Sequence, residues 1–297
     1  MNKSSAKLLP IGTILLSSRA TVGECSINKK ECTTNQGFQS LIPKENISNE
    51  FVYYLIQTKR KDLIRKSCGS TFLEISANEV RKIVVSIPTI KEQDKIAKLL
   101  SLLDERIATQ NKIIDELQSL IKGISQKIVR FNKPNVRLSE CLVCKSSTLQ
   151  ESDVYEQGTY PVYGANGIVG YLDNYNTEGE AVYIIKDGSG VGTVSYVTGK
   201  CSATGTLNTL QAKEGYFLQY LYYLLKVFNF EPYKTGMAIP HIYFKDYGKA
   251  KFFCPSYTEQ LQYAQSLSAI DSKLLVEKNI LTSLSLQKQY LLRQMFI

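Results

Sequence analysis

The 297-residue sequence contains a single histidine, His241. Ser-His-Asp catalysis and most catalytic metal sites need imidazole groups, so this scarcity leaves little scope for either. No G-x-x-x-x-G-K-[ST] loop, N-P-P-[YF] motif or D-E-x-H box occurs. The glycine-rich run 188–192 is not a phosphate-binding loop of known pattern, because a strand rather than a helix is expected to follow it. We therefore expect a chain that is not itself an enzyme and binds no cofactor.

Long hydrophobic runs are also missing. The most apolar stretch, Tyr220–Leu225, is far shorter than the ~20 residues of a membrane-spanning helix. Leu8–Leu16 faintly resembles a signal peptide, but Pro10 and Gly12 interrupt it and Arg19 follows. We interpret this segment as the start of a domain, and we expect a cytoplasmic protein with no membrane partner.

The seven cysteines are odd in number and irregularly spaced. Without an export signal they are expected to remain free thiols. Cys141 and Cys144 form a lone C-x-x-C, and a closed zinc site would need two more ligands nearby. Small buried residues are the simpler interpretation, and no metal site is expected.

Charge is unevenly distributed along the chain. Residues 1–133 carry 22 Lys/Arg and 13 Asp/Glu, whereas residues 134–297 carry 14 of each. Within the second part, residues 136–180 are mainly acidic and residues 181–251 mainly basic. A locally basic surface with 19 tyrosines interspersed suits a polyanionic partner such as nucleic acid, although basic surfaces also occur on proteins without such partners.

An internal repeat of about 167 residues runs through the chain. Ile87-Pro88, Glu92-Gln93, Ala97, Leu100 and Leu103-Asp104 recur at one offset as Cys254-Pro255, Glu259-Gln260, Ala264, Leu267 and Ile270-Asp271. The aromatic segments that start at Phe51 and Phe217 also correspond. A repeat of this length indicates a tandem duplication.

Each copy ends in a long helix, predicted over 91–133 and 259–297. Apolar residues in both helices step 4-3-4-3, as in a coiled-coil seam. Gln110 and Glu277 occupy equivalent seam positions near mid-helix, so they would be neighbours in an antiparallel pair and would help to fix its register. The alternative is that each helix lies on its own domain.

A globular part precedes each helix, over residues 1–90 and 134–258. In the first part we expect a strand at Thr13–Ser17. In the second, the pattern predicts strands at Ala181–Ile185, Gly192–Val197, Asn208–Gln211 and Ala250–Phe253, and a helix over Tyr216–Phe228. The predicted fold class is α+β, built as a tandem duplication of a recognition domain plus a long helix, with the two helices forming an antiparallel coiled coil.

Loops of the second part are rich in Gly, Thr, Asn and Lys, around 163–167, 187–192 and 204–206. Such loops bring backbone amides and lysines to phosphates and place amide and hydroxyl groups at base edges, although single glycines also serve as ordinary turns. With the repeat and the long helices, the segments Tyr160–Gly167 and Ile185–Gly192 make the chain resemble the specificity subunit of type I restriction-modification enzymes.

The resemblance implies that each target recognition domain reads one half of a split target in double-stranded DNA and that the paired helices act as a spacer. It also implies that methyltransferase (modification) subunits bind S-adenosylmethionine and dock on the chain, with a motor-nuclease restriction subunit joining for cleavage. Adenine methylation and restriction would then be directed by this chain and performed by its partners. The DNA-facing positions carried over are Tyr163, Asn166, Lys186, Ser189, Lys200, Thr204, Lys234 and His241 in the second domain, and Arg19, Thr21, Gln36, Ser70 and Thr71 in the first.

The first copy departs from the second in length. About 45 residues precede the strand at Ala181 in the second copy, and only about a dozen precede Thr13. The first domain is therefore expected to be truncated at its N-terminus and to lack a counterpart of Tyr160–Gly167. Two alternatives from other classes are a coiled-coil scaffold whose globular ends bind proteins, and an enzyme with an unrecognised site.

Overall fold

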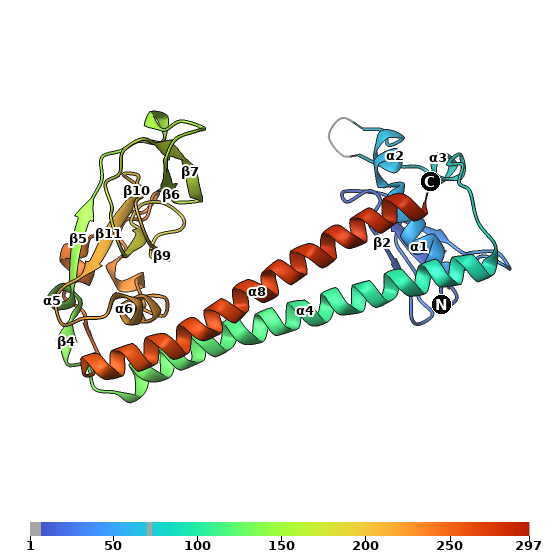
Figure 1. The fold of residues 1–297 in the computed structure, drawn as a ribbon. Coiled ribbons are helices and arrows are strands. Elements are labelled where there is room, and N and C mark those ends of the chain that lie inside the picture. Colours follow the sequence, from blue (N-terminus) through green and yellow to red (C-terminus); the bar gives the residue numbers. More distant parts are fainter. Residues whose placement is uncertain (1–6, 70–72, 297) are drawn as a thin grey trace. The chain divides into compact units, whose positions relative to one another are not determined.

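The computed structural model describes residues 7–69 and 73–296. The chain divides into two compact units, unit 1 (residues 1–113 and 277–297) and unit 2 (residues 114–276). Two long helices, α4 (Ile90–Phe131) and α8 (Tyr257–Met295), each contribute one half to each unit (Figure 1). Each helix begins and ends within two residues of the bounds predicted from the sequence.

Unit 1 contains a three-stranded antiparallel sheet in the order β2-β1-β3. Its elements before the long helix are β1 (Ile14–Ser17), β2 (Cys25–Ile27), β3 (Phe38–Leu41), α1 (Asn49–Thr58), α2 (Arg60–Arg65) and α3 (Ala77–Arg81). Ile14 and Leu16 of β1 are fully buried against Ile56 of α1 and Leu63 of α2. The strand predicted at Thr13–Ser17 is confirmed over Ile14–Ser17, where Leu15 is the one residue that is not buried.

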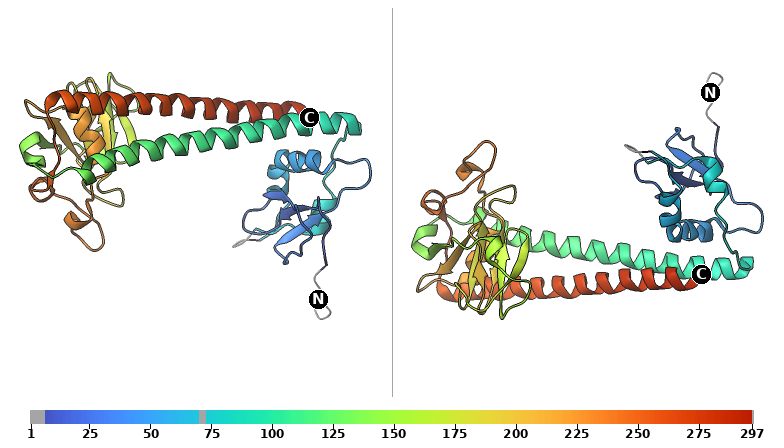
Figure 2. Two further views of the ribbon diagram at one scale, coloured as in Figure 1. Left: turned by 90° about the horizontal axis from the view of Figure 1, so that it is seen from below. Right: turned by 90° about the horizontal axis from the view of Figure 1, so that it is seen from above.

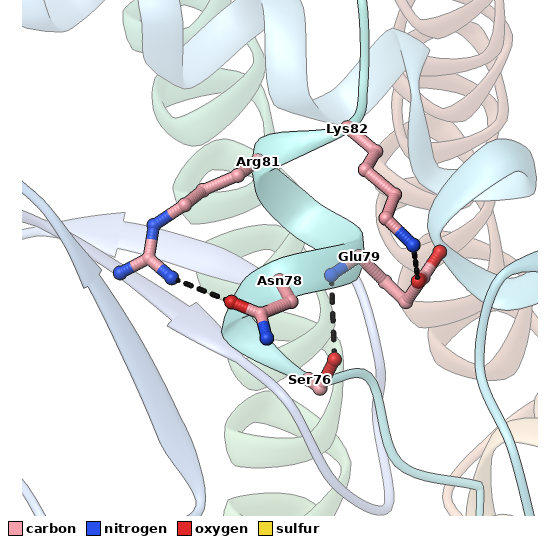
Figure 3. Close-up of polar contacts among 5 residues, drawn as sticks. All are labelled: Ser76, Asn78, Glu79, Arg81 and Lys82. Atoms are coloured by element: carbon pink, nitrogen blue, oxygen red, sulfur yellow. Dashed lines mark hydrogen bonds and ion pairs between the residues drawn. The ribbon is translucent and has the colours of Figure 1, made fainter.

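Helix α3 is short and is held at both ends by its own side chains (Figure 3). The Ser76 hydroxyl accepts a hydrogen bond from the Glu79 amide at 3.3 Å, which caps the helix N-terminus. Arg81 donates to the Asn78 side chain at 2.9 Å, and Lys82 pairs with Glu79 at 2.5 Å.

Unit 2 is built around a four-stranded antiparallel sheet in the order β5-β11-β8-β9. A second sheet has the order β10-β6-β7, and a two-stranded ribbon joins β12 and β4. The strands are β4 (Val136–Arg137), β5 (Leu142–Ser146), β6 (Tyr160–Gly164), β7 (Gly167–Leu172), β8 (Ala181–Ile185), β9 (Val194–Val197), β10 (Ser202–Ala203), β11 (Leu207–Ala212) and β12 (Lys251–Phe252). The helical elements are α5 (Leu138–Cys141), η1 (Glu151–Asp153), α6 (Leu218–Leu225), η2 (Glu231–Tyr233) and α7 (Phe244–Tyr247).

All four predicted strands and the predicted helix of the second copy are present, with β8 matching residue for residue and the others differing at their ends. All five side chains of β8 are buried, in a core that includes Tyr183 and Leu207. Strands β5, β6 and β7 were not predicted. The mixed helix-and-strand class is confirmed.

The two long helices pack against each other and run antiparallel in both units (Figures 1 and 2). In unit 1, Leu100 and Leu103 of α4 pack with Leu284 of α8. The predicted neighbours Gln110 and Glu277 do meet, since the Gln110 amide donates to the backbone carbonyl of Glu277 at 3.1 Å and also to its carboxylate. Both side chains are buried, so this polar pair specifies register inside an otherwise apolar seam.

The repeated Glu-Gln dipeptide ties each long helix to the helix of the preceding domain. Gln93 accepts from the amide of Ser48, the N-cap of α1, at 2.9 Å and donates to the Pro88 carbonyl at 2.9 Å. Gln260 repeats both contacts with Phe217, the N-cap of α6, at 2.8 Å and with Pro255 at 3.0 Å. Both glutamines are buried, so these bonds satisfy polar groups that water cannot reach.

The repeated aspartate has a similar role. Asp104 accepts a hydrogen bond from the Tyr54 hydroxyl of α1 at 2.9 Å and pairs with Lys288 at 2.6 Å. In unit 2, burial together with a hydrogen bond to Asp271 raises the pKa of Tyr223 in α6. In each copy the repeated aspartate of the long helix therefore contacts a tyrosine of the aromatic helix, although Tyr223 lies about one turn beyond Tyr220, the counterpart of Tyr54.

The duplication is visible in the sheets. Strands β1, β2 and β3 correspond to β8, β9 and β11, and they pair in the same order. Elements β4 to β7 precede β8 in unit 2, and the described residues of unit 1 that precede β1 contain no counterpart of them.

All seven cysteines are free thiols. Within residues 7–69 and 73–296, no cluster of three or more His, Cys, Asp or Glu side chains is arranged to hold a metal ion. No helix in the same described part is long and apolar enough to cross a membrane.

Candidate nucleic-acid interface

Two loops of unit 2 meet at the end of β8, and we call them loop A (residues 186–192) and loop B (residues 234–241). Isolated β-bridges join Asp187 to His241 and Thr235 to His241. The amide of Gly188 donates to the Pro240 carbonyl at 2.9 Å. Backbone bonds therefore hold the two loops together, so their tips form one surface.

A side-chain contact reinforces this junction. Nδ1 of His241 lies 2.7 Å from a carboxylate oxygen of Asp187, and both side chains are about one-third exposed. A partly exposed pair of this kind contributes little to overall stability. Its effect is to orient the two loops relative to each other.

Unit 1 repeats the junction with different side chains. Arg19 and Glu74 form both an isolated bridge and an ion pair of 2.9 Å, at the positions that correspond to Asp187 and His241. Cys68 bridges Glu74 as Thr235 bridges His241. The same backbone arrangement thus carries a cation on the first loop in unit 1 and an anion there in unit 2, which gives the two copies different surface chemistry. Ser70 and Thr71 lie outside the described residues.

The hairpin formed by β6 and β7 continues the surface of loop A. Lys186 donates its amide to Thr206 at 3.0 Å, and the turn at 204–206 donates from Thr204 to the Tyr163 carbonyl at 2.9 Å. Asn166 is exposed in the two-residue turn of the hairpin, next to Gly167 with φ +102°. The hairpin, the 204–206 turn and loop A are therefore contiguous.

The predicted residues of unit 2 differ in accessibility. Asn166 and Ser189 are exposed, and Lys186 is half-buried. Tyr163 is also half-buried, with its ring centre 5.6 Å from that of Tyr183, and burial raises the pKa of Tyr163. These residues supply amide, hydroxyl, ammonium and phenol groups on the contiguous hairpin and loop A.

Thr204 does not fit the predicted DNA-facing role in this conformation. It is only 1% exposed, and its hydroxyl shares a hydrogen bond with that of Thr206 at 2.8 Å. Its side chain therefore stabilises the turn from inside, and we leave it out of the interface.

Two of the predicted lysines have acidic neighbours. Lys234 is 2.5 Å from Glu231, and Lys200 is 3.8 Å from Glu178 and sits over the Tyr175 ring at 4.7 Å. Pairs this exposed are weak, so a phosphate group can replace the carboxylate at little cost. Both lysines stay in the candidate interface as phosphate-binding groups.

The remaining predicted residues of unit 1 lie on exposed turns. Thr21 is exposed, and its hydroxyl is 3.2 Å from that of Ser17. Gln36 is exposed in the turn before β3. Arg19 is exposed but engaged with Glu74, so it can reach a phosphate only by exchanging that partner.

Loop B contains two apolar side chains that sequence reasoning missed. Met237 is fully exposed and Ile239 is 58% exposed, beside Gly236 with φ +87°. Apolar side chains at such tips can insert between base steps. The signal in the sequence is an apolar run between Gly236 and Pro240, which is unusual for a solvated loop.

Comparison with known proteins gives a consistent result. A family model described as the type I restriction modification DNA specificity domain matches residues 1–119 and 135–286. The EcoprrI specificity subunit of Escherichia coli is 22% identical over 291 residues, which covers 90% of this chain and 73% of that protein. The MjaIX specificity subunit of Methanocaldococcus jannaschii is 39% identical over 122 residues, and the match spans only 28% of its length.

A solved structure shares the fold. The S subunit of a type I restriction-modification system from M. genitalium aligns with a TM-score of 0.70 over 98% of this chain and 84% of that one, at 20% identity.

Proposed function

Because the chain belongs to the type I restriction-modification DNA specificity family, we propose that loops A and B and the β6–β7 hairpin of unit 2 form the surface that reads one DNA half-site. Proteins of this family are specificity components, and the relatives are named as specificity subunits rather than as methylases or nucleases. The chain is accordingly a non-catalytic DNA-recognition subunit.

The observation that carries the proposed surface is the repeated junction of loops A and B. Its bridges recur in unit 1 at the same offset, while its side chains differ between the copies. A duplicated frame that holds variable side chains is suited to reading two different sequences. Reading one sequence twice would favour identical side chains in the two copies.

The chemistry of this surface matches what DNA offers. Lys200 and Lys234 supply cations for phosphates, which position a protein on the duplex without selecting a sequence. Asn166 offers an amide that can pair with an adenine edge in the major groove, and Ser189 offers a hydroxyl. We assign base reading to Asn166 and Lys186, and phosphate binding mainly to the other lysines.

We also propose the partners. Modification subunits that bind S-adenosylmethionine would dock on this chain and methylate adenine, and a motor-nuclease restriction subunit would join for cleavage in the cytoplasm. The paired helices α4 and α8 supply long exposed faces for such docking. Purified alone, the chain is expected neither to hydrolyse ATP nor to methylate DNA.

A binding titration tests the DNA-reading surface. Labelled duplexes are titrated with the full chain and its modification subunit at several salt concentrations, and log K is expected to fall linearly with log salt. Lys186→Ala should weaken binding, whereas Lys251→Ala, on an exposed position of β12 in the same unit, should leave it unchanged. Salt-independent binding, or equal effects of the two substitutions, would contradict the proposed surface.

A further inference from the structure

Unit 1 has an open apolar groove beside its sheet, with a volume of about 470 Å³. Strand β3, helices α1 and α3 and the segment before α4 line it, chiefly through Leu41, Ile42, Val52, Val80, Val85 and Ile87. Ile42 is 59% exposed and Ile87 is 41% exposed, so the groove leaves aliphatic surface open to solvent.

The outer edge of β3 borders this groove and has no partner strand among the described residues. The sheet order β2-β1-β3 leaves β3 at the edge, whereas its counterpart β11 has β8 on one side and β5 on the other. The first four residues of β11 are buried, and none of the four residues of β3 is. The sheet of unit 1 thus matches the four-stranded sheet of unit 2, except that among the described residues no strand pairs with the outer edge of β3.

In unit 2 the segment 136–146 occupies the corresponding place. It contains β4, α5 and β5, and its side chains Leu138, Cys141 and Leu142 are buried to 2% exposure or less. The segment bonds to β12 on one side and to β11 on the other.

The segment 136–146 also contacts residues of unit 2 whose counterparts in unit 1 line the groove. The amide of Lys213 donates to the Cys141 carbonyl at 2.8 Å, and the amide of Ser139 donates to the Gly248 carbonyl at 2.8 Å. At the repeat offsets of 169 and 167 residues, Lys213 and Gly248 correspond to Lys44 and Arg81, and both of these line the groove.

The backbone of β3 can accept such a strand. In unit 2, Gly205 and Lys213 donate to Leu149 and Cys141, so every second residue of β11 faces β5. By the same alternation residues 36, 38, 40, 42 and 44 of unit 1 face outward, and because the Phe38 amide already donates to the Asn35 carbonyl at 3.3 Å, the open donors of the strand edge are those of residues 40, 42 and 44. Pro43, which has no N–H, falls between them and faces the other way, so it removes no donor from the open edge.

We propose that this groove docks a polypeptide segment of the 136–146 type, supplied from outside the described residues, which adds an antiparallel strand to β3 and fills the groove with its apolar side chains. This is strand addition to an exposed sheet edge, in which main-chain bonds give affinity and the groove gives specificity. A second copy of this chain is a poor donor. The described residues of each copy contain two such places but one such segment, which unit 2 already uses. The proposal does not depend on DNA reading.

One difference between the copies predicts which side chain the docked segment should carry at one position. Arg81 stands where unit 2 has Gly248, and it lines the groove. Its guanidinium donates to the Asn78 side chain at 2.9 Å (Figure 3). In unit 2, Ser139 lies against Gly248. A segment with a carboxylate at the position of Ser139 would therefore pair with Arg81 and bind more tightly than the copy of residues 136–146 itself.

The probe for the test is a fluorescent peptide with the sequence of residues 134–148, titrated into the full chain. We expect saturable binding, and at least tenfold slower hydrogen exchange in the segment 38–42. A peptide with Leu138→Asp and Leu142→Asp should not bind. Ile42→Glu in the chain should abolish binding, whereas Ile11→Glu, at an equally exposed aliphatic side chain outside the groove, should not.

A peptide carrying Ser139→Asp should bind several-fold more tightly than the 134–148 peptide, and Arg81→Ala in the chain should cancel that gain. The peptide variants are compared on the unaltered chain. Misfolding of a chain variant therefore cannot produce the expected difference between the peptides. Absence of binding, protection elsewhere than in 38–42, or self-association of the chain that protects the β3 edge would each overturn the proposal. None of these outcomes bears on DNA binding, which is measured separately.

Discussion

Burial is the main cause of the raised thiol pKa values of two half-buried cysteines, Cys25 and Cys144. Burial raises the pKa of each thiol to about 11, with the nearby carboxylate of Glu24 adding to the shift at Cys25. At Cys144 the ammonium of Lys186 acts in the opposite direction but does not overcome burial. Thiolate is the reactive form, so both cysteines are expected to react slowly with alkylating reagents, and exposed Cys68 should react first.

The raised pKa values predict a loss of stability in alkaline solution. Between about pH 9 and pH 11 the two thiols keep their protons in the folded chain and lose them in the unfolded chain. The unfolded state then binds fewer protons, so the free energy of unfolding falls as pH rises through this window. Urea unfolding at pH 7.5 and 10.5 measures the fall.

The matched variants isolate the thiols from other groups that titrate in the same range. Replacing both Cys25 and Cys144 by Ala should reduce the fall in stability between the two pH values, whereas Cys68→Ala should not alter it. An equal fall in all three proteins would show that the two buried thiols do not control it.

At the scale of elements, the polar pair in the helix seam has the clearest energetic consequence. Gln110 and Glu277 are both buried, and the donor of one satisfies two acceptors of the other. Burying a polar group without a partner costs about 1–3 kcal/mol, which is more than a satisfied pair contributes. The pair therefore selects one register of α4 against α8 more than it stabilises the pair of helices.

Gln110→Leu should lower the free energy of unfolding by about 1–3 kcal/mol, because it removes the donor to a buried carboxylate. Replacing both residues by Leu should recover most of that loss and weaken register selection, which would be visible as heterogeneous association by light scattering. Thr109→Ala, on an exposed position of the same helix, is the control and should change stability by less than about 0.5 kcal/mol. A double variant as unstable as the single one would argue against this role.

At the scale of the whole molecule, the two copies are unequal. Unit 2 has the β6–β7 hairpin with Asn166 at its tip, and the described residues of unit 1 have no counterpart of it. The first 133 residues nevertheless carry the whole excess of positive charge. We therefore predict that such a chain attracts DNA through one copy and discriminates among sequences mainly through the other.

Asn166→Ala or Lys186→Ala should therefore relax specificity or weaken binding at one half-site, by about 1–3 kcal/mol for a lost base contact. Arg19→Ala should weaken binding to all sequences alike and reduce the salt slope by about 1. Selection from randomised duplexes with the modification subunit present compares the variants. Two equally well-defined half-sites in the unaltered protein would show that unit 1 reads bases as well as unit 2 does.

The long-range regularities of this protein were predictable from its sequence. The duplication, both long helices, their antiparallel pairing and the meeting of Gln110 with Glu277 all follow from a heptad repeat and a fixed offset. Strand β8 was equally predictable, because a short apolar run between turn residues is typical of a buried strand. These features are local or periodic, so the order of residues is sufficient to reveal them.

Tertiary structure decided the rest. Strands β6 and β7 contain a proline and three glycines, residues that weaken strand propensity, and only pairing with each other and with β10 makes them strands. The burial of Thr204, the junction of Asp187 with His241 and the open edge of β3 likewise depend on segments far apart in the chain. A sequence shows which residues can pair, but the presence or absence of a neighbouring strand determines which of them stay exposed to bind something else.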